Sequence, residues 1–324
     1  MATPETSRAP NRRALLKGLG AAGLGAGLAG LSGVGANRLY AQPVRKATEA
    51  IQTKPIPASG ENIPVIGMGT WITFNVGDDA ALRDQRTQIL ETFFSHGGGM
   101  IDCSPMYGTS ADVLGYGLEK LGYPASLFAA SKVWTAGWQD GEEQMAEQRA
   151  RWGVDRFDLM QIHNLVDWEA HLETLKDDKA EGRIRYLGLT TSHGRRHGEL
   201  ERIMEREELD FVQLTYNMAD REAEARLLPL ARERGIAVIA NRPFRHRQLI
   251  ETYQGRPPTW AAEEAGARNW PEFFLKFIVS HPAVTCAIPA TSQLDHMREN
   301  MGAGLGHVPN EKTRARMSAY LESL

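Results

Sequence analysis

The sequence predicts a single α/β domain in which eight strand–helix units close into a (β/α)₈ TIM barrel. Short apolar runs, typical of strands covered on both faces, alternate eight times with amphipathic stretches of helical length. Several helical stretches end just before a glycine, as at Gly97, Gly122, Gly182 and Gly235, which is a common helix stop signal. Eight such units in one chain of 324 residues favour a closed barrel over an open doubly wound sheet.

The expected elements run in order through residues 42–324, the predicted barrel domain. Strands are expected at Val65–Thr70, Met100–Asp102, Leu127–Lys132, Phe157–His163, Ile184–Thr190, Phe211–Tyr216, Ala237–Ala240 and Thr285–Pro289. Helices are expected at 80–96, 110–121, 141–152, 168–181, 197–207, 222–234, 270–281 and 292–303. A connector with a short hairpin occupies 42–64, and an extra C-terminal helix covers about 310–323. The arginine- and proline-rich segment between Ala240 and Asn269 is expected as a long loop on the C-terminal face, where barrel active sites lie.

The composition is that of an ordinary soluble globular protein. Hydrophobic residues make up 42% of the chain, charged residues 24%, and the formal net charge is −3. No basic stripe dominates, which argues against a nucleic-acid partner. Cys103 and Cys286 are too few for a disulfide framework, so we expect buried free thiols. A single bridge in an oxidising compartment is the alternative.

Residues 1–41 have the layout of an export signal. They carry five basic residues and one acidic residue, a net charge of +4 on a chain whose remainder carries −7. Arg12-Arg13 is followed by an apolar Gly/Ala-rich stretch from Gly18 to Ala36, and this order resembles a twin-arginine signal peptide. We therefore expect export by the twin-arginine translocase, to the periplasm or otherwise out of the cytoplasm. The alternative is an N-terminal tail with chance arginines.

The site at which the leader is cleaved is open between two positions. Small residues precede a break after Ala36 and after Ala41, and an uncleaved leader would act as a tether. A cleaved protein is expected to have no stable membrane span. The run Gly18 to Gly23 also satisfies the G-x-G-x-x-G pattern, but no strand precedes it, so it fails the test for a dinucleotide fingerprint.

Polar side chains lie at the ends of three predicted strands. Asp102 ends the second strand, Lys132 the third and His163 the fourth, and Tyr107 follows Asp102 in the next loop. Inward-pointing polar groups at strand ends are costly to bury unless they pair with one another. Because the carboxyl ends of barrel strands meet on one face, the four are predicted to form a site.

These segments resemble the aldo-keto reductase family. The resemblance rests on Ile66-Gly67-Met68-Gly69-Thr70-Trp71, Ile101-Asp102-Cys103-Ser104-Pro105-Met106-Tyr107-Gly108, Ala130-Ser131-Lys132-Val133, Asp158-Leu159-Met160-Gln161-Ile162-His163, and Ile288-Pro289-Ala290-Thr291-Ser292 with Glu299-Asn300. It spans about residues 50–305 in the family's order. It implies an oxidoreductase that transfers hydride from a nicotinamide cofactor to the carbonyl of a small aldehyde or ketone.

The resemblance assigns a role to each of the four residues. Tyr107 is the expected general acid, and Lys132 is expected to lower its pKa from the ordinary value of about 10. Asp102 would hold Lys132 charged and oriented. His163 would donate a hydrogen bond to the carbonyl oxygen.

The resemblance also implies a cofactor site and a substrate pocket. The expected cofactor contacts are Thr190, Thr191 and Gln213 at the carboxamide, Tyr216 stacking on the nicotinamide, Arg242 and Arg245 at the pyrophosphate, Thr291 and Ser292 at a helix start, and His296, Glu299 and Asn300 at the adenosine end. NADP is expected, with NAD possible. Thr191 and Asn241 depart from the family's usual asparagine and tyrosine. Trp71, Trp134 and Trp138 are expected to wall an apolar pocket.

Other interpretations remain at this point. Asp102 and Lys132 alone could form a structural ion pair, and His163 alone could be a core histidine. A cofactor-binding redox sensor or scaffold with slow turnover is the second hypothesis, and a metal-dependent hydrolase the third. His193 and His197 have i, i+4 spacing but lack the glutamate of a zinc-protease motif, so no metal is expected. Family habit implies a monomer.

Overall fold

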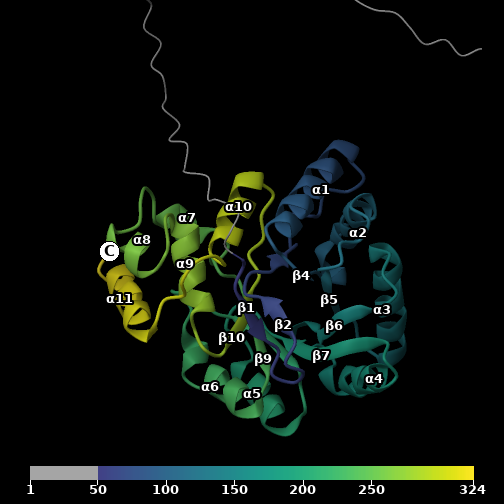
Figure 1. Ribbon diagram of the computed structural model, residues 1–324. Coiled ribbons are helices and arrows are strands. Elements are labelled where there is room, and N and C mark those ends of the chain that lie inside the picture. Colours follow the sequence, from purple (N-terminus) through teal and green to yellow (C-terminus); the bar gives the residue numbers. More distant parts are fainter. Residues whose placement is uncertain (1–49) are drawn as a thin grey trace, which may run out of the picture. The chain divides into compact units, whose positions relative to one another are not determined.

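The computed structural model describes residues 50–324. The predicted leader, residues 1–41, and the first part of the connector lie outside the described residues. The described part forms one barrel, shown in Figure 1 with its strands at the centre and its helices around them.

Eight parallel strands form the barrel wall. They are β3 (Met68–Gly69), β4 (Met100–Asp102), β5 (Phe128–Val133), β6 (Phe157–Ile162), β7 (Ile184–Thr190), β8 (Phe211–Thr215), β9 (Ala237–Asn241) and β10 (Val284–Ala287). Each strand pairs with the next in sequence, from β3 to β10. The ring closes through parallel bridges from Ile66 to Ala287 and from Gly69 to Ala290. The predicted (β/α)₈ barrel is therefore confirmed.

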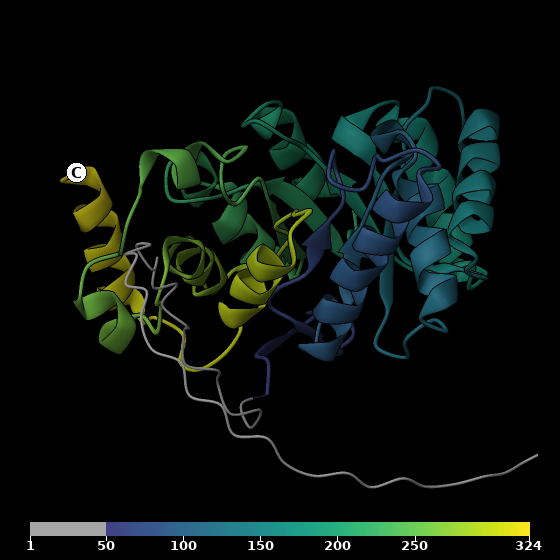
Figure 2. The same cartoon turned by 90° about the horizontal axis from the view of Figure 1, so that it is seen from above.

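Helices cover the outside of the strands. They are α1 (Ala80–Ser95), α2 (Ser110–Lys120), α3 (Trp138–Trp152), α4 (Trp168–Ala180), α5 (His197–Arg206), α6 (Leu227–Arg234), α9 (Trp270–Val279), α10 (Leu294–Gly302) and α11 (Glu311–Glu322). Asp79, Asn269 and Asn310 each accept a backbone N–H of the first turn that follows, which fixes the start of α1, α9 and α11. Helix α11 lies on the opposite side of the barrel from α3 (Figures 1 and 2).

Two predicted segments differ in detail. The helix expected over 222–234 is broken into a 3₁₀ turn, η3 (Glu222–Glu224), and α6, because Arg226 between them has φ −144°. The long loop after β9 contains two single-turn helices, α7 (Gln248–Thr252) and α8 (Trp260–Glu264). Helix periodicity is a weak signal over so few residues, which is why the sequence showed only a loop.

The predicted N-terminal hairpin covers the amino end of the barrel, opposite the face that carries the carboxyl ends of the strands. Strands β1 (Thr53–Pro55) and β2 (Asn62–Pro64) pair antiparallel. Ile56 and Ile63 from this hairpin are buried with the interior residues of the barrel strands. Nζ of Lys54 donates to the carbonyls of Val279, His281 and Val284, which ties the hairpin to the end of α9. The amino end of the barrel is therefore plugged by side chains.

Close helix packing explains one glycine inside a helix. A Cβ added to Gly115 in α2 would lie 2.0 Å from the carbonyl oxygen of Arg151 in α3. Glycine costs a helix about 1 kcal/mol relative to alanine. Here it allows two helix backbones to approach more closely than any side chain would permit.

Both cysteines are free and buried. Burial raises the pKa of Cys103 to about 11 and that of Cys286 to about 12. Neither thiol is therefore a thiolate at neutral pH, and neither is a candidate nucleophile. No helix within residues 50–324 has the length and the apolar character needed to cross a bilayer.

Candidate active site

Three polar side chains lie at the carboxyl ends of neighbouring strands. Asp102 is the last residue of β4, Lys132 lies near the end of β5, and His163 directly follows β6. Tyr107 ends the short 3₁₀ turn η1 (Pro105–Tyr107) that follows β4. The parallel barrel therefore places all four residues on its C-terminal face.

Lys132 and Asp102 form a buried ion pair. Nζ of Lys132 lies 2.5 Å from Oδ2 of Asp102, and the side chains are 0% and 2% exposed. Nζ also donates to the carbonyl oxygen of Cys103 at 2.9 Å. Burying two charges is costly, and the close pairing together with the additional hydrogen bond offsets that cost.

Two glutamine amides hold the other oxygen of Asp102. Nε2 of Gln161 and Nε2 of Gln213 donate to Oδ1 at 3.1 Å and 2.8 Å. Nε2 of Gln213 also donates to Oε1 of Gln161 at 3.1 Å. The carboxylate is thus bound on both oxygens, so its orientation toward Lys132 is fixed.

Tyr107 and His163 lie next to this pair. Their rings meet edge to face with centroids 5.8 Å apart. Nζ of Lys132 lies 5.2 Å from the centroid of the Tyr107 ring. The structure therefore brings together the four residues that the sequence predicted as a site.

The pKa of Tyr107 is opposite in direction to the sequence-based expectation. Burial raises this pKa well above the ordinary value of 10.0, and the nearby Asp102 and Cys103 raise it further. The ammonium of Lys132 is engaged with Asp102 and with the Cys103 carbonyl instead of the phenol oxygen. Tyr107 is therefore a protonated phenol at neutral pH.

The pKa of His163 is lowered to about 3, first by burial and then by the positive charge of Lys132. The imidazole is therefore neutral above about pH 4. A neutral imidazole has one N–H donor and one acceptor nitrogen, so its tautomer decides what it can offer a ligand.

Gln161 and Ser104 also contribute to the site, although neither was predicted as a functional residue. Alternation along β6 places residues 159, 161 and 163 on one face, and this signal identifies Gln161 as an inward polar residue. Ser104 carries no such signal, because it lies in the loop between Asp102 and Tyr107. Its contact with His163 depends on how two separate loops fold.

The sequence profile described as "Aldo/keto reductase family" matches residues 65–316. The chain belongs to the aldo/keto reductase family. It is therefore a member of a family of oxidoreductases.

Individual relatives agree with this assignment. Methylglyoxal reductase YeaE of Escherichia coli is 27% identical over 260 residues, which cover 77% of this chain and 89% of that protein. The structure of the thermostable aldo-keto reductase Tm1743, in complex with the inhibitor epalrestat, is similar with a TM-score of 0.68 and 26% identity, covering 83% of this chain and 99% of that one. An aldo/keto reductase from Klebsiella pneumoniae, in complex with NADP and acetate, shares the fold with a TM-score of 0.68 at 24% identity, covering 81% and 92% of the two chains.

In this aldo/keto reductase, the residues expected at the carboxamide lie at the end of β7 and in the middle of β8. Oγ1 of Thr190 accepts the backbone N–H of Asn164 at 2.9 Å. Nδ2 of Asn241 donates to the carbonyl oxygen of Thr191 at 2.9 Å and to Oε1 of Gln213 at 3.3 Å. The hydroxyl of Thr191 is buried without a partner among the described residues. An unsatisfied buried hydroxyl beside two amides fits a polar group such as a carboxamide.

The placement of Tyr216 corrects a sequence-based prediction. Its hydroxyl donates to Oε1 of Glu224 at 2.5 Å and accepts from Nη2 of Arg314 at 2.8 Å. Its ring is fully buried and stacks on Phe277 of α9, with centroids 6.1 Å apart. Gln213 faces into the barrel, so strand alternation points Tyr216 outward to the helices. Tyr216 therefore does not stack on a nicotinamide at the mouth.

The arginine loop after β9 reaches other loops of the C-terminal face. Nη1 of Arg242 contacts Nε2 of His193 at 2.6 Å and also contacts Nε2 of His246. His246 in turn meets the ring of Trp71 edge to face, with centroids 4.6 Å apart. Arg245 lies 3.3 Å from Asp220 in an ion pair. Arg242 is therefore placed among the mouth loops, while Arg245 is engaged by a carboxylate.

The residues predicted at the helix start lie just before α10, and those predicted at the adenosine end lie within it. Oγ1 of Thr291 accepts the backbone N–H of Gln293 at 3.1 Å. Thr291 and Asn300 are buried, whereas Ser292 and His296 are exposed. Burial is the main cause that raises the pKa of Glu299.

The three tryptophans occupy different positions. Trp71 follows β3, and Trp134 lies beside His163, with ring centroids 6.3 Å apart. Both are partly exposed, so both can border a substrate. Trp138 is the first residue of α3 and is 50% exposed. Within the described residues, Trp134 is the one of the three whose ring contacts a ring of the tetrad, the four residues Asp102, Tyr107, Lys132 and His163.

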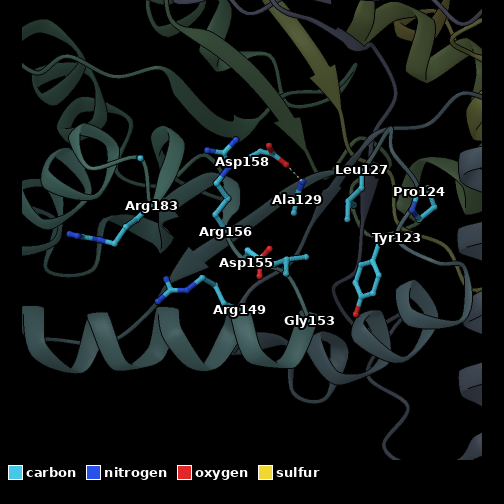
Figure 3. A pocket seen from close by; sticks show the side chains of 12 residues that line it. Tyr123, Pro124, Leu127, Ala129, Arg149, Gly153, Asp155, Arg156, Asp158 and Arg183 are labelled. Atoms are coloured by element: carbon cyan, nitrogen blue, oxygen red, sulfur yellow. Dashed lines mark hydrogen bonds between the residues drawn. The ribbon is translucent and has the colours of Figure 1, made fainter.

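A cavity of about 900 Å³ lies away from this site, and Figure 3 shows the residues that line it. They include Tyr123, Leu127 and Asp158, near the amino ends of β5 and β6, whereas Lys132 and His163 are at the carboxyl ends. Across residues 50–324, no group of three or more His, Cys, Asp or Glu side chains could hold a metal ion.

Proposed function

We propose that this protein is an NADPH-dependent reductase of aldehyde or ketone carbonyls, with Tyr107 as the proton donor. The observation that carries the proposal is the buried Lys132–Asp102 pair, placed beside Tyr107 and His163 on the C-terminal face of the barrel. A buried ion pair in contact with a half-buried phenol and a buried imidazole at the mouth of a barrel is typical of a catalytic site.

The reduced nicotinamide supplies the hydride when it is bound. Thr191, with its unpartnered hydroxyl, is the group that would hold its carboxamide, with Thr190 and Gln213 beside it. Thr291 and Ser292 precede α10, where backbone N–H groups favour phosphate. The NADP complex of the Klebsiella relative favours NADP. NAD is the alternative, since a similar Escherichia coli protein is described as an NADH-specific methylglyoxal reductase, at 25% identity over 239 residues.

The residues of this chain manage the charge that develops on the carbonyl oxygen. His163 donates a hydrogen bond to that oxygen and orients the carbonyl. Tyr107 gives up its phenolic proton as the oxygen becomes an alkoxide. Lys132 lies close enough for its positive charge to stabilise the tyrosinate that remains. Asp102 holds Lys132 in place through the buried ion pair.

The proposal includes the location and state of the protein. Residues 1–41 would direct the folded protein through the twin-arginine translocase, so that a cofactor bound before export travels with it. The exported protein would act as a monomer on a small carbonyl substrate. Fractionation of cells that produce the full chain, with Arg12 and Arg13 replaced by lysine as the control, tests this location.

The enzymatic proposal is tested by following NADPH or NADH absorbance with a panel of carbonyl compounds that includes methylglyoxal. We expect consumption of the reduced cofactor, faster with NADPH. Tight binding of cofactor seen by fluorescence, with no turnover on any substrate, would favour the sensor hypothesis instead. Absence of both binding and turnover would exclude both functions.

A further inference from the structure

Ser104 connects the two segments that carry the proposed donors. Its Oγ lies 2.7 Å from Nδ1 of His163, and the side chains are buried, at 1% and 5% exposure. Oγ also accepts the backbone N–H of Met106 at 3.2 Å, as the cap of the turn that ends in Tyr107. One hydroxyl therefore contacts the ring of one tetrad residue and the backbone turn of another.

The hydrogen bonds of Ser104 decide which atom carries the proton between its Oγ and Nδ1 of His163. A serine hydroxyl has one proton to donate and two lone pairs that accept. One lone pair receives the N–H of Met106. Among the residues that the structure describes, Nδ1 of His163 is the acceptor available for the hydroxyl proton. If Nδ1 carried a proton instead, a buried hydroxyl hydrogen would have no partner, which folded proteins avoid.

The other ring nitrogen then carries the histidine proton. His163 is neutral, because burial and Lys132 lower its pKa to about 3. With Nδ1 accepting from Ser104, the single ring proton lies on Nε2. No protein partner of Nε2 is found in residues 50–324, so this N–H remains available to a ligand.

We propose that Ser104 is a positioning residue whose hydroxyl holds His163 in the Nε2–H tautomer, with that N–H directed to the substrate carbonyl. The inference rests on the proposed function, because it gives His163 its partner in that reaction. The opposite tautomer would present a lone pair to the carbonyl oxygen and repel it. Ser104 therefore makes His163 a hydrogen-bond donor.

The first test reads the tautomer directly and needs no activity. The purified full chain is labelled with ¹⁵N-histidine, and nitrogen–proton correlation spectra assign the proton to Nδ1 or Nε2. The chain has nine histidines, so the signals of His163 are identified by their loss in His163→Ala. We expect Nε2–H in the wild type and a mixture of both tautomers in Ser104→Ala. Nδ1–H in the wild type would overturn the proposal.

The second test separates the effect on His163 from the capping of the Tyr107 turn. Ser104→Ala should lower kcat/KM for carbonyl reduction by about 10- to 100-fold, the range expected when a buried hydrogen-bond partner is removed. Ser104→Thr, which keeps a hydroxyl, should restore most of this loss. In a His163→Ala background, Ser104→Ala should cost less than about 3-fold, because the two changes remove one interaction. An equal loss in both backgrounds would show that Ser104 acts through the turn alone.

Ser110→Ala is the matched control. Ser110 is also fully buried and also anchors this turn, since its Oγ donates to the carbonyl oxygen of Tyr107 at 2.8 Å. It has no contact with His163 among the described hydrogen bonds. Its loss should leave the tautomer of His163 unchanged. If the protein proves inactive on every carbonyl, the proposed function fails, but the spectra still decide the tautomer.

Discussion

Replacing Tyr107 by phenylalanine should lower kcat for carbonyl reduction by about 10²- to 10⁴-fold, the usual contribution of a positioned general acid. The change removes the phenolic proton but keeps the ring that packs on His163 and Lys132. Initial rates with NADPH and methylglyoxal measure it. Quenching of protein fluorescence by NADPH is the control, and binding should stay within about 3-fold of the wild type.

A smaller loss of kcat in Tyr107→Phe would mean that another group donates the proton. His163→Ala should lower the rate as well, but it leaves the phenolic proton in place. If Tyr107→Phe retained more than about a tenth of the wild-type rate, Tyr107 would not be the acid of this reaction, and the Nε2–H of His163 or a water molecule would supply the proton.

The pH dependence should differ between the two directions of the reaction. Reduction needs the protonated phenol, and burial raises the pKa of Tyr107 well above 10.0, so kcat for reduction should stay level from about pH 5 to 9. Alcohol oxidation needs the phenolate, whose fraction rises tenfold per pH unit below that pKa. The oxidation rate should therefore still be rising at pH 10. His163, with a pKa of about 3, adds no transition near neutrality. A plateau in oxidation near pH 8 would show that the pKa of Tyr107 is lowered instead.

The sequence predicted the elements and the tetrad because both are marked locally. Apolar runs of strand length and glycine stops repeat along the chain, and Asp102, Lys132 and His163 each lie where such a run ends. Parallel strands bring those ends together without any further information. The position of these residues in the chain is therefore almost sufficient to place them in space.

The remaining features depend on packing between segments that are distant in sequence. Tyr216 pairs with Glu224 and Arg314, and Arg314 comes from the last helix. Nothing near Tyr216 marks that contact, although strand alternation with Gln213 already points it outward. The direction of the Tyr107 pKa depends on how deeply the fold buries the phenol, which residue types alone do not reveal.

Replacing Lys132 by methionine should lower kcat by about 10²-fold or more and also destabilise the protein. Methionine keeps the length of the side chain but removes the charge that stabilises the tyrosinate as the proton leaves Tyr107. Asp102 would remain buried as a carboxylate without its cation, and losing one partner of a buried pair costs about 3–5 kcal/mol. Urea unfolding gives the stability and the NADPH assay gives the rate.

The double variant Lys132→Met with Asp102→Asn distinguishes a catalytic pair from a structural one. It removes both charges, so the free energy of unfolding should recover most of the roughly 3–5 kcal/mol lost in Lys132→Met. The rate should not recover, because the positive charge beside Tyr107 is still absent. If activity returned together with stability, the buried pair would serve only to hold the barrel together. Recovery of stability without activity assigns Lys132 to the chemistry itself.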